Sequence, residues 1–147
     1  MIKIKFQKSN IYDFDIHKEL NPNIWDEDTL RLEVRKTLIK IAKEFIDYLN
    51  LDVEWNDIKD IILTGSLANY NFTKYSDIDL HILIDFSTID ENFELVKEYL
   101  ISKKIIWNIK HNINIKGYEV EIYPQDINET HHSRGVYSVL NNKWNIK

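Results

Sequence analysis

Two aspartates separated by one residue are the most chemically suggestive feature of this sequence. Asp77 and Asp79 open a segment, 77–84, in which Ile or Leu occupies every second position. Side chains two residues apart on a β-strand point to the same face, so these carboxylates are predicted to lie together, about 6–7 Å apart along the chain. Carboxylate oxygens are preferred ligands of Mg²⁺, which also keeps sites for phosphate. The pair predicts a Mg²⁺ or Mn²⁺ site, although such pairs also occur on ordinary solvated strands.

A glycine and a serine upstream supply a possible phosphate site. Gly65-Ser66 ends the apolar run 61–64, and ten residues separate Ser66 from Asp77. Glycine lets the backbone turn sharply and approach a ligand, and the amides that follow can bind an anion. If the segments 61–64 and 77–84 are neighbouring strands, metal and nucleotide phosphates would share one site, with the Ser66 hydroxyl as a further ligand.

These residues resemble a known motif. The run Gly65-Ser66-Leu67-Ala68, followed by Ser76-Asp77-Ile78-Asp79-Leu80, is similar to that of the DNA polymerase β-type nucleotidyltransferase superfamily, above all its minimal stand-alone members, including MNT-type antitoxins. Over most of the chain, the sequence also resembles small predicted nucleotidyltransferases encoded by phages. That wider resemblance rests on the segments 20–26, Trp107-Asn108 with His111, 120–123 with Gln125-Asp126, and Ser133 with 135–138.

The resemblance implies a minimal nucleotidyltransferase fold and a two-metal reaction. A nucleoside monophosphate would pass from an NTP to a hydroxyl of an RNA, a protein or a small molecule, with release of pyrophosphate. By position, Gly65 and Ser66 match the phosphate-contacting turn, and Asp77 and Asp79 match the metal-binding pair. Ser76, just before that pair, is a further candidate for binding the nucleotide.

The resemblance also implies a third carboxylate on a later strand. Glu121 is preferred because it lies between Val120 and Ile122, in an apolar strand where a carboxylate is unfavourable unless it has a partner. Glu119 is the alternate candidate, but beside the turn it could simply be solvated. Arg134 is a candidate for neutralising phosphate.

The sequence departs from the MNT pattern after Ala68. The pattern often continues Arg-Gly, whereas Asn69-Tyr70 stands here, so a triphosphate contact from such an arginine is not expected. His81 shares the predicted face of Asp79 and could support it or be an ordinary strand residue. His131-His132 is predicted to lie in a solvated loop rather than to bind metal as a pair, because adjacent side chains in an extended segment point apart.

Composition limits the remaining possibilities. The 147 residues are 44% hydrophobic with only three Gly and two Pro, which predicts one domain over residues 1–147. A net charge of −5 argues against general DNA binding. No apolar run approaches a membrane span of about 18 residues, and the first residues lack a signal peptide, so a cytoplasmic protein is expected, in the host cytoplasm if a phage encodes it. The oligomeric state stays open.

Hydrophobic periodicity predicts an α/β (α+β) fold, with a mixed β-sheet and helices packed on one face. The other face would then be free for a site. The expected helices span about 29–49, capped by Asp26 or Asp28, and 91–101. The expected strands are 1–6, 61–64, 77–84, a hairpin of 107–116 with 118–123, and a weak strand in 135–140. Trp25, Trp55 and Trp144 are assigned to packing.

Two other functions remain compatible with these patterns. The chain could be a non-catalytic or antitoxin-like module that keeps the nucleotidyltransferase fold and binds a partner protein. It could also bind RNA without catalysis, through the segment 101–147, where Lys and Arg outnumber the acids.

Overall fold

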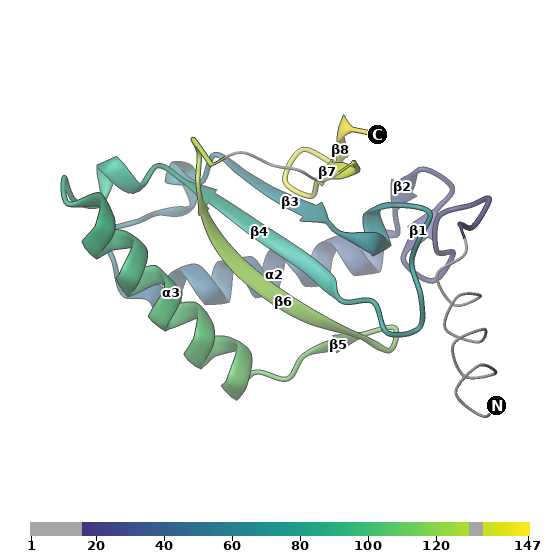
Figure 1. Ribbon diagram of the computed structural model, residues 1–147, viewed down its shortest axis with the longest axis horizontal. Coiled ribbons are helices and arrows are strands. Elements are labelled where there is room, and N and C mark those ends of the chain that lie inside the picture. The colour runs from purple at the N-terminus through teal and green to yellow at the C-terminus, as the bar shows by residue number, and fades with distance from the viewer. Residues whose placement is uncertain (1–15, 130–133) are drawn as a thin grey trace, which may run out of the picture.

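The computed structural model describes residues 16–129 and 134–147, and its centre is a six-stranded mixed sheet (Figure 1). The strand order is β5-β6-β4-β3-β7-β8. The bounds are β3 Asp60–Thr64, β4 Ile78–Ile84, β5 Asn114–Ile115, β6 Tyr118–Asp126, β7 Val136–Ser138 and β8 Lys143–Ile146. The α+β class and the mixed sheet are confirmed. The expected strand 1–6 and His131-His132 lie outside the described residues.

The central strands place the aspartate segment in the middle of the sheet. β3 pairs antiparallel with β4, and β4 pairs parallel with β6. In β4 every second residue, from Ile78 to Ile84, is buried, while the residues between them are partly exposed. The predicted alternation is therefore confirmed, and the partly exposed face of β4 carries Asp79 and His81.

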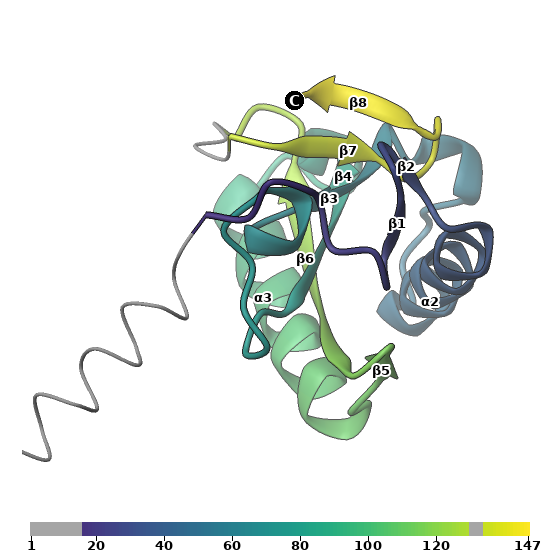
Figure 2. The ribbon, with the colours of Figure 1, turned by 90° about the vertical axis from the view of Figure 1, so that its right-hand side faces the viewer.

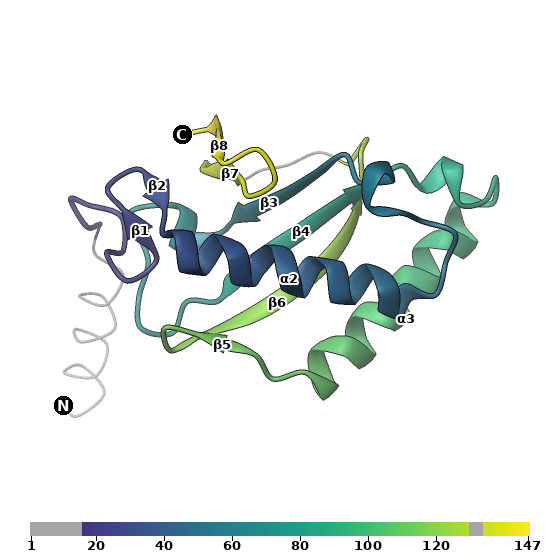
Figure 3. The ribbon, with the colours of Figure 1, turned by 180° about the vertical axis from the view of Figure 1, so that it is seen from behind.

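Helix α2, Leu32–Leu49, covers the buried face of the sheet (Figures 1 and 3). The predicted apolar stripe is confirmed, since Val34, Leu38 and Phe45 are among its buried residues. The predicted start and caps are wrong. Thr29–Leu30 forms strand β2, which pairs with β1, Trp25–Asp26, and Arg31 occupies the N-cap position without a side-chain cap.

Helix α3, Phe93–Lys110, is longer than predicted, and it includes residues 107–110, the start of the strand expected in 107–116. The physical reason lies in Trp107, which is buried and packs edge-on against Phe45 of α2, so continuing the helix buries a large aromatic side chain. Only Asn114–Ile115 forms a strand, the short arm of the hairpin with β6.

Helix α3 connects the parallel strands β4 and β6 and contacts both β6 and α2. In Figure 1 no helix lies in front of β4 and β6, and α3 lies beside β6 (Figures 1 and 2). Across residues 16–129 and 134–147, neither helix is long and apolar enough to cross a membrane.

Candidate active site

The glycine turn and the aspartate pair meet at one corner of the sheet. Thr64, the last residue of β3, is the register partner of Asp79 on β4. Gly65 follows with φ +82° and ψ −168°, a backbone conformation that is essentially restricted to glycine. A Cβ on Gly65 would lie 2.3 Å from Oδ2 of Asp79, so glycine alone permits this close approach. The structure thus brings together the two halves of the motif, which are separated by ten residues in the sequence.

Glu121 is the later carboxylate that lies opposite this corner. In the parallel pairing of β4 with β6, Glu121 is the register partner of Asp79. Glu119 instead pairs with Asn114 of β5 and is exposed, whereas Glu121 is half-buried. The strand register therefore favours Glu121 over Glu119 as the third acid of the cluster.

The three acids affect one another electrostatically. Burial, followed by the charges of Glu121 and Asp77, raises the pKa of Asp79 from its usual 3.8 to about 6. Burial, and then the charge of Glu121, also raises the pKa of Asp77. Negative charges held this close in a partly buried site are unfavourable unless a proton or a cation compensates them.

The donor atoms fit a hard divalent cation, because all three side chains offer carboxylate oxygens. Their present arrangement is not yet a metal site: within the described part of the chain, no group of three or more His, Cys, Asp or Glu side chains is gathered so as to hold a metal ion. Oε2 of Glu121 accepts a hydrogen bond from the hydroxyl of Tyr123, which fixes the orientation of this carboxylate. If such a cation binds here, Asp77, Asp79 and Glu121 are the residues that would hold it.

Two serine hydroxyls join the glycine turn to the loop before β4. Ser66 donates a hydrogen bond from Oγ to Oγ of Ser76, at 2.6 Å. Oγ of Ser76 also accepts the backbone N–H of Thr73, at 2.8 Å. Ser66, predicted to contact phosphate, and Ser76, predicted to bind the nucleotide, thus connect the turn to the loop before the aspartates.

A buried tryptophan supports the turn from behind, a role that the sequence analysis missed. Trp25 donates from Nε1 to the backbone oxygen of Leu67, at 2.7 Å, and both residues are buried. The Trp25 ring stacks on Trp144 and meets Tyr137 edge-on. The packing assignments of Trp25 and Trp144 are correct, and the hydrogen bond shows that this packing also positions the turn.

The C-terminal segment reaches the same turn through a second glycine. A Cβ on Gly135 would lie 2.0 Å from the backbone oxygen of Ala68, so the segment leading into β7 passes directly against the turn. Arg134 is exposed immediately before this contact. Arg134 therefore precedes a residue that contacts Ala68, which is three residues after Gly65 in the chain. Its contact with phosphate stays a prediction.

Tyr123 is the second residue that the sequence analysis missed. It lies two residues beyond Glu121 on the same face of β6 and, besides its hydrogen bond, stacks on His81 with ring centroids 4.9 Å apart. Burial and the hydrogen bond to Glu121 raise the pKa of Tyr123 above its usual range, so the hydroxyl stays protonated and continues to donate. The alternation of 119, 121 and 123 on one strand face was the available sequence signal.

Comparison with known proteins gives one family match. A family model described as a nucleotidyltransferase domain matches residues 38–140, which include β3, the glycine turn, β4, β6 and β7. Searches of curated proteins and of solved structures returned no significant match. Because the matched segment covers most of the chain and contains the whole candidate site, the chain belongs to the nucleotidyltransferase domain family.

Proposed function

We propose that this protein transfers a nucleoside monophosphate from an NTP to a hydroxyl acceptor, with Mg²⁺ or Mn²⁺ held by Asp77, Asp79 and Glu121. The observation that carries the proposal is the position of Asp79, which lies against Gly65 on one side and opposite Glu121 on the other. A phosphate chain on the glycine turn would then lie beside the acids. Family membership supports nucleotidyl transfer in general, and this geometry supports the assignment of residues.

The reaction balances without any further reactant. The acceptor oxygen attacks the α-phosphorus and forms a new P–O bond, while the bond from that phosphorus to the bridging α,β-oxygen breaks and pyrophosphate leaves. Glu121 is the proposed acceptor of the hydroxyl proton. Bound divalent metal would supply charge neutralisation and align the phosphates. Gly65 and Ser66 would hold the β- and γ-phosphates, with Arg134 neutralising their charge.

Labelling tests the proposal directly. The protein is incubated with each of the four NTPs, labelled at the α-phosphate, with Mg²⁺ or Mn²⁺ in cell extract. We expect one or more components to become labelled and Asp77→Asn to reduce labelling by about 10³-fold, roughly the several kcal/mol that metal-assisted catalysis supplies. Asp47→Asn, which changes an exposed acid on α2, is the matched control and should label as the parent does.

Two results would contradict this assignment. One is Asp77→Asn labelling at the parental rate. The other is a stable partner protein that co-purifies with the chain, independently of NTP and metal, in preparations that label nothing; that outcome would favour the partner-binding module.

Tyr123→Phe should weaken metal binding with little effect on folding. The substitution deletes the hydroxyl that donates to Glu121 and leaves the ring stack on His81 in place. We expect the Mg²⁺ concentration for half-maximal labelling to shift by about threefold to tenfold, as for loss of one hydrogen bond worth about 1 kcal/mol. Tyr118→Phe, on the same strand, removes a hydroxyl that accepts a hydrogen bond from Nδ2 of Asn21, and it should leave the Mg²⁺ dependence unchanged. An equal shift in both variants would contradict a positioning role for Tyr123.

A further inference from the structure

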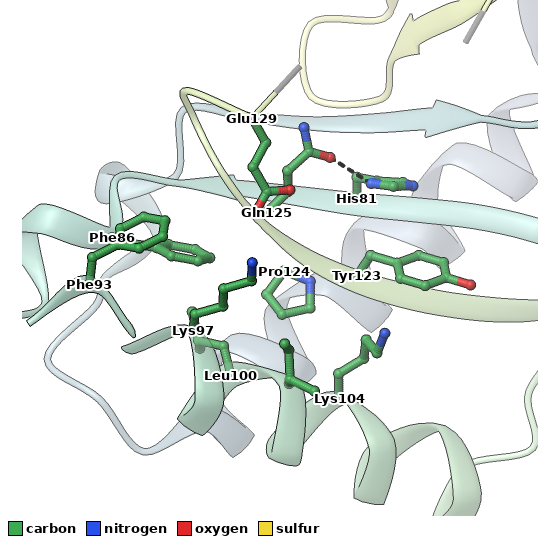
Figure 4. A pocket seen from close by; sticks show the side chains of 11 residues that line it. His81, Phe86, Phe93, Lys97, Leu100, Lys104, Tyr123, Pro124, Gln125 and Glu129 are labelled. Carbon is green, nitrogen blue, oxygen red and sulfur yellow. Dashed lines mark hydrogen bonds between the residues drawn. The ribbon is translucent and has the colours of Figure 1, made fainter. Parts of the chain in front are cut away.

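A pocket of about 460 Å³ lies beside the candidate active site, between helix α3 and the open face of β4 and β6 (Figure 4). We call it the α3 pocket. Its polar lining consists of Lys97 and Lys104 from α3, His81 from β4, Tyr123 and Gln125 from β6, and Glu129. Pockets of this size with a few convergent polar groups are typical of small-molecule sites.

The α3 pocket begins two residues further along β4 and β6 than the acids. His81 follows Asp79 by two residues on β4, and Tyr123 follows Glu121 by two residues on β6, on the same faces. Such a step is about 7 Å. The hydrogen bond from Tyr123 to Glu121 links the pocket wall to the acid cluster. A molecule in the pocket can therefore place a reactive group at the acids.

The α3 pocket and the glycine turn lie on opposite sides of the acid cluster. Gly65 touches Asp79 from the β3 side, at the start of β4, whereas the pocket lies toward the end of β4 and on the β6 side. In-line displacement at phosphorus requires the attacking and leaving oxygens to be on opposite sides. With the leaving phosphates on the glycine turn, the attacking hydroxyl comes from the side of the α3 pocket.

The lining of the α3 pocket carries more positive than negative side chains, and part of it is apolar. Lys97 and Lys104 outnumber the single acid, Glu129, although the chain as a whole has a net charge of −5. In Figure 4 both lysine side chains extend from α3 toward the strand residues, and Nζ of Lys104 lies 4.6 Å from the ring centroid of Tyr123. The apolar lining includes Phe86, Leu100 and Pro124.

We propose that the α3 pocket binds the acceptor, and that the acceptor is a small organic anion which directs its hydroxyl toward Asp79 and Glu121. This inference rests on the proposed nucleotidyl transfer and names its acceptor class. A long nucleic-acid acceptor fits less well, because a chain with a net charge of −5 disfavours binding that depends on many phosphate contacts.

The binding experiment uses the full chain without metal or NTP. Phenyl phosphate, benzoate and benzyl alcohol are titrated while backbone amide resonances are followed by NMR. We expect both anions to shift resonances of residues lining the α3 pocket and to bind at least fivefold more tightly than the neutral alcohol. The ratio between the two anions distinguishes a phosphate-bearing acceptor from a carboxylate-bearing one. Equal affinity for all three probes, or shifts only elsewhere, would overturn the proposal.

Charge reversal separates the acceptor site from the nucleotide site. Lys97→Glu should weaken phenyl phosphate at least tenfold and reduce labelling of the acceptor, while Mg-NTP affinity stays within twofold of the parent. Lys40→Glu, an exposed lysine on α2, is the matched control. A saturating NTP analogue that cannot be cleaved between the α- and β-phosphates should leave phenyl phosphate bound in the pocket.

Two outcomes of this second experiment have distinct meanings. Displacement of phenyl phosphate from the α3 pocket by the analogue would overturn the acceptor assignment and make the pocket part of the NTP site. Parental labelling by Lys97→Glu would also overturn it, while leaving the proposed transfer activity intact. Failure of the transfer activity itself is detected separately by the Asp77→Asn comparison.

Discussion

Asp79→Asn should make the metal-free protein more stable at neutral pH and at the same time abolish nucleotidyl transfer. The pKa of Asp79 is raised to about 6 in the folded protein, mainly by burial and further by Glu121 and Asp77, from the usual 3.8 that applies to the unfolded chain. The folded state therefore binds a proton more tightly than the unfolded state does. The stability that this proton confers is fully present below about pH 4 and is lost as the pH rises through 6.

An uncharged asparagine avoids this loss. At pH 7.5 without metal we expect Asp79→Asn to exceed the parent in unfolding free energy by about 1–2 kcal/mol, a value reduced from the full pKa shift because the carboxyl is partly exposed. That corresponds to a Tm higher by roughly 3–6 °C for a domain of this size. At pH 4 the two proteins should melt together, and labelling by the variant should fall by about 10³-fold.

Mg²⁺ provides the decisive comparison for Asp79→Asn. The parent should gain Tm on addition of Mg²⁺ at pH 7.5 and gain less at pH 5, where protons compete for the acids, while the variant should gain little at either pH. Asp47→Asn serves again as the control, with parental stability and a parental response. If Asp79→Asn destabilised the metal-free protein at pH 7.5, or responded fully to Mg²⁺, Asp79 would not belong to a repulsive metal-binding cluster.

Gly65→Ala should inactivate the protein and destabilise it. Two costs act together: the backbone has φ +82° and ψ −168°, which disfavours any side chain by about 1–3 kcal/mol, and the new Cβ would lie 2.3 Å from Oδ2 of Asp79. Either the turn or Asp79 must move. We expect a loss of about 2–4 kcal/mol of stability in urea unfolding and a loss of labelling of at least 10²-fold.

Gly117→Ala is the matched control for this substitution. Gly117 also has a positive φ, +87°, but a Cβ there meets nothing within 4 Å. Its replacement should cost backbone strain of about 1 kcal/mol and leave labelling unchanged. Comparison of the two variants separates left-handed backbone strain from the contact with Asp79.

A double variant tests whether Asp79 is the group that Gly65→Ala displaces. In an Asp79→Ala background the clashing oxygen is absent, so Gly65→Ala should cost about 1–2 kcal/mol less stability than it does in the parent. If Gly65→Ala costs the same stability in both backgrounds, the clash is not with the Asp79 carboxylate. Full activity of Gly65→Ala would remove the glycine turn from the proposed nucleotide site.

Local patterns allowed the core of the candidate site and part of the fold to be predicted. The alternation in 77–84 and the apolar stripe of α2 depend on side-chain periods that any window of the sequence displays. Gly65 could be singled out because only glycine tolerates such a turn. The boundaries were less certain: Thr29–Leu30 joined a small sheet, and Trp107 extended α3 by packing on α2, because tertiary burial outweighed local preference.

The sequence by itself determined which side chains share a strand face: Asp79 with His81 on β4, and Glu119 with Glu121 and Tyr123 on β6. Asp77, predicted to share the face of Asp79, lies one residue before β4. From the sequence alone, Glu121 was preferred to Glu119 as the third carboxylate, but the choice stayed open. Only the tertiary structure decided that Glu121 stands opposite Asp79, that Gly135 meets Ala68, and that lysines of α3 border the open face. Strand register and the path of a crossover helix are set by contacts between residues far apart in the chain, and no local period encodes them.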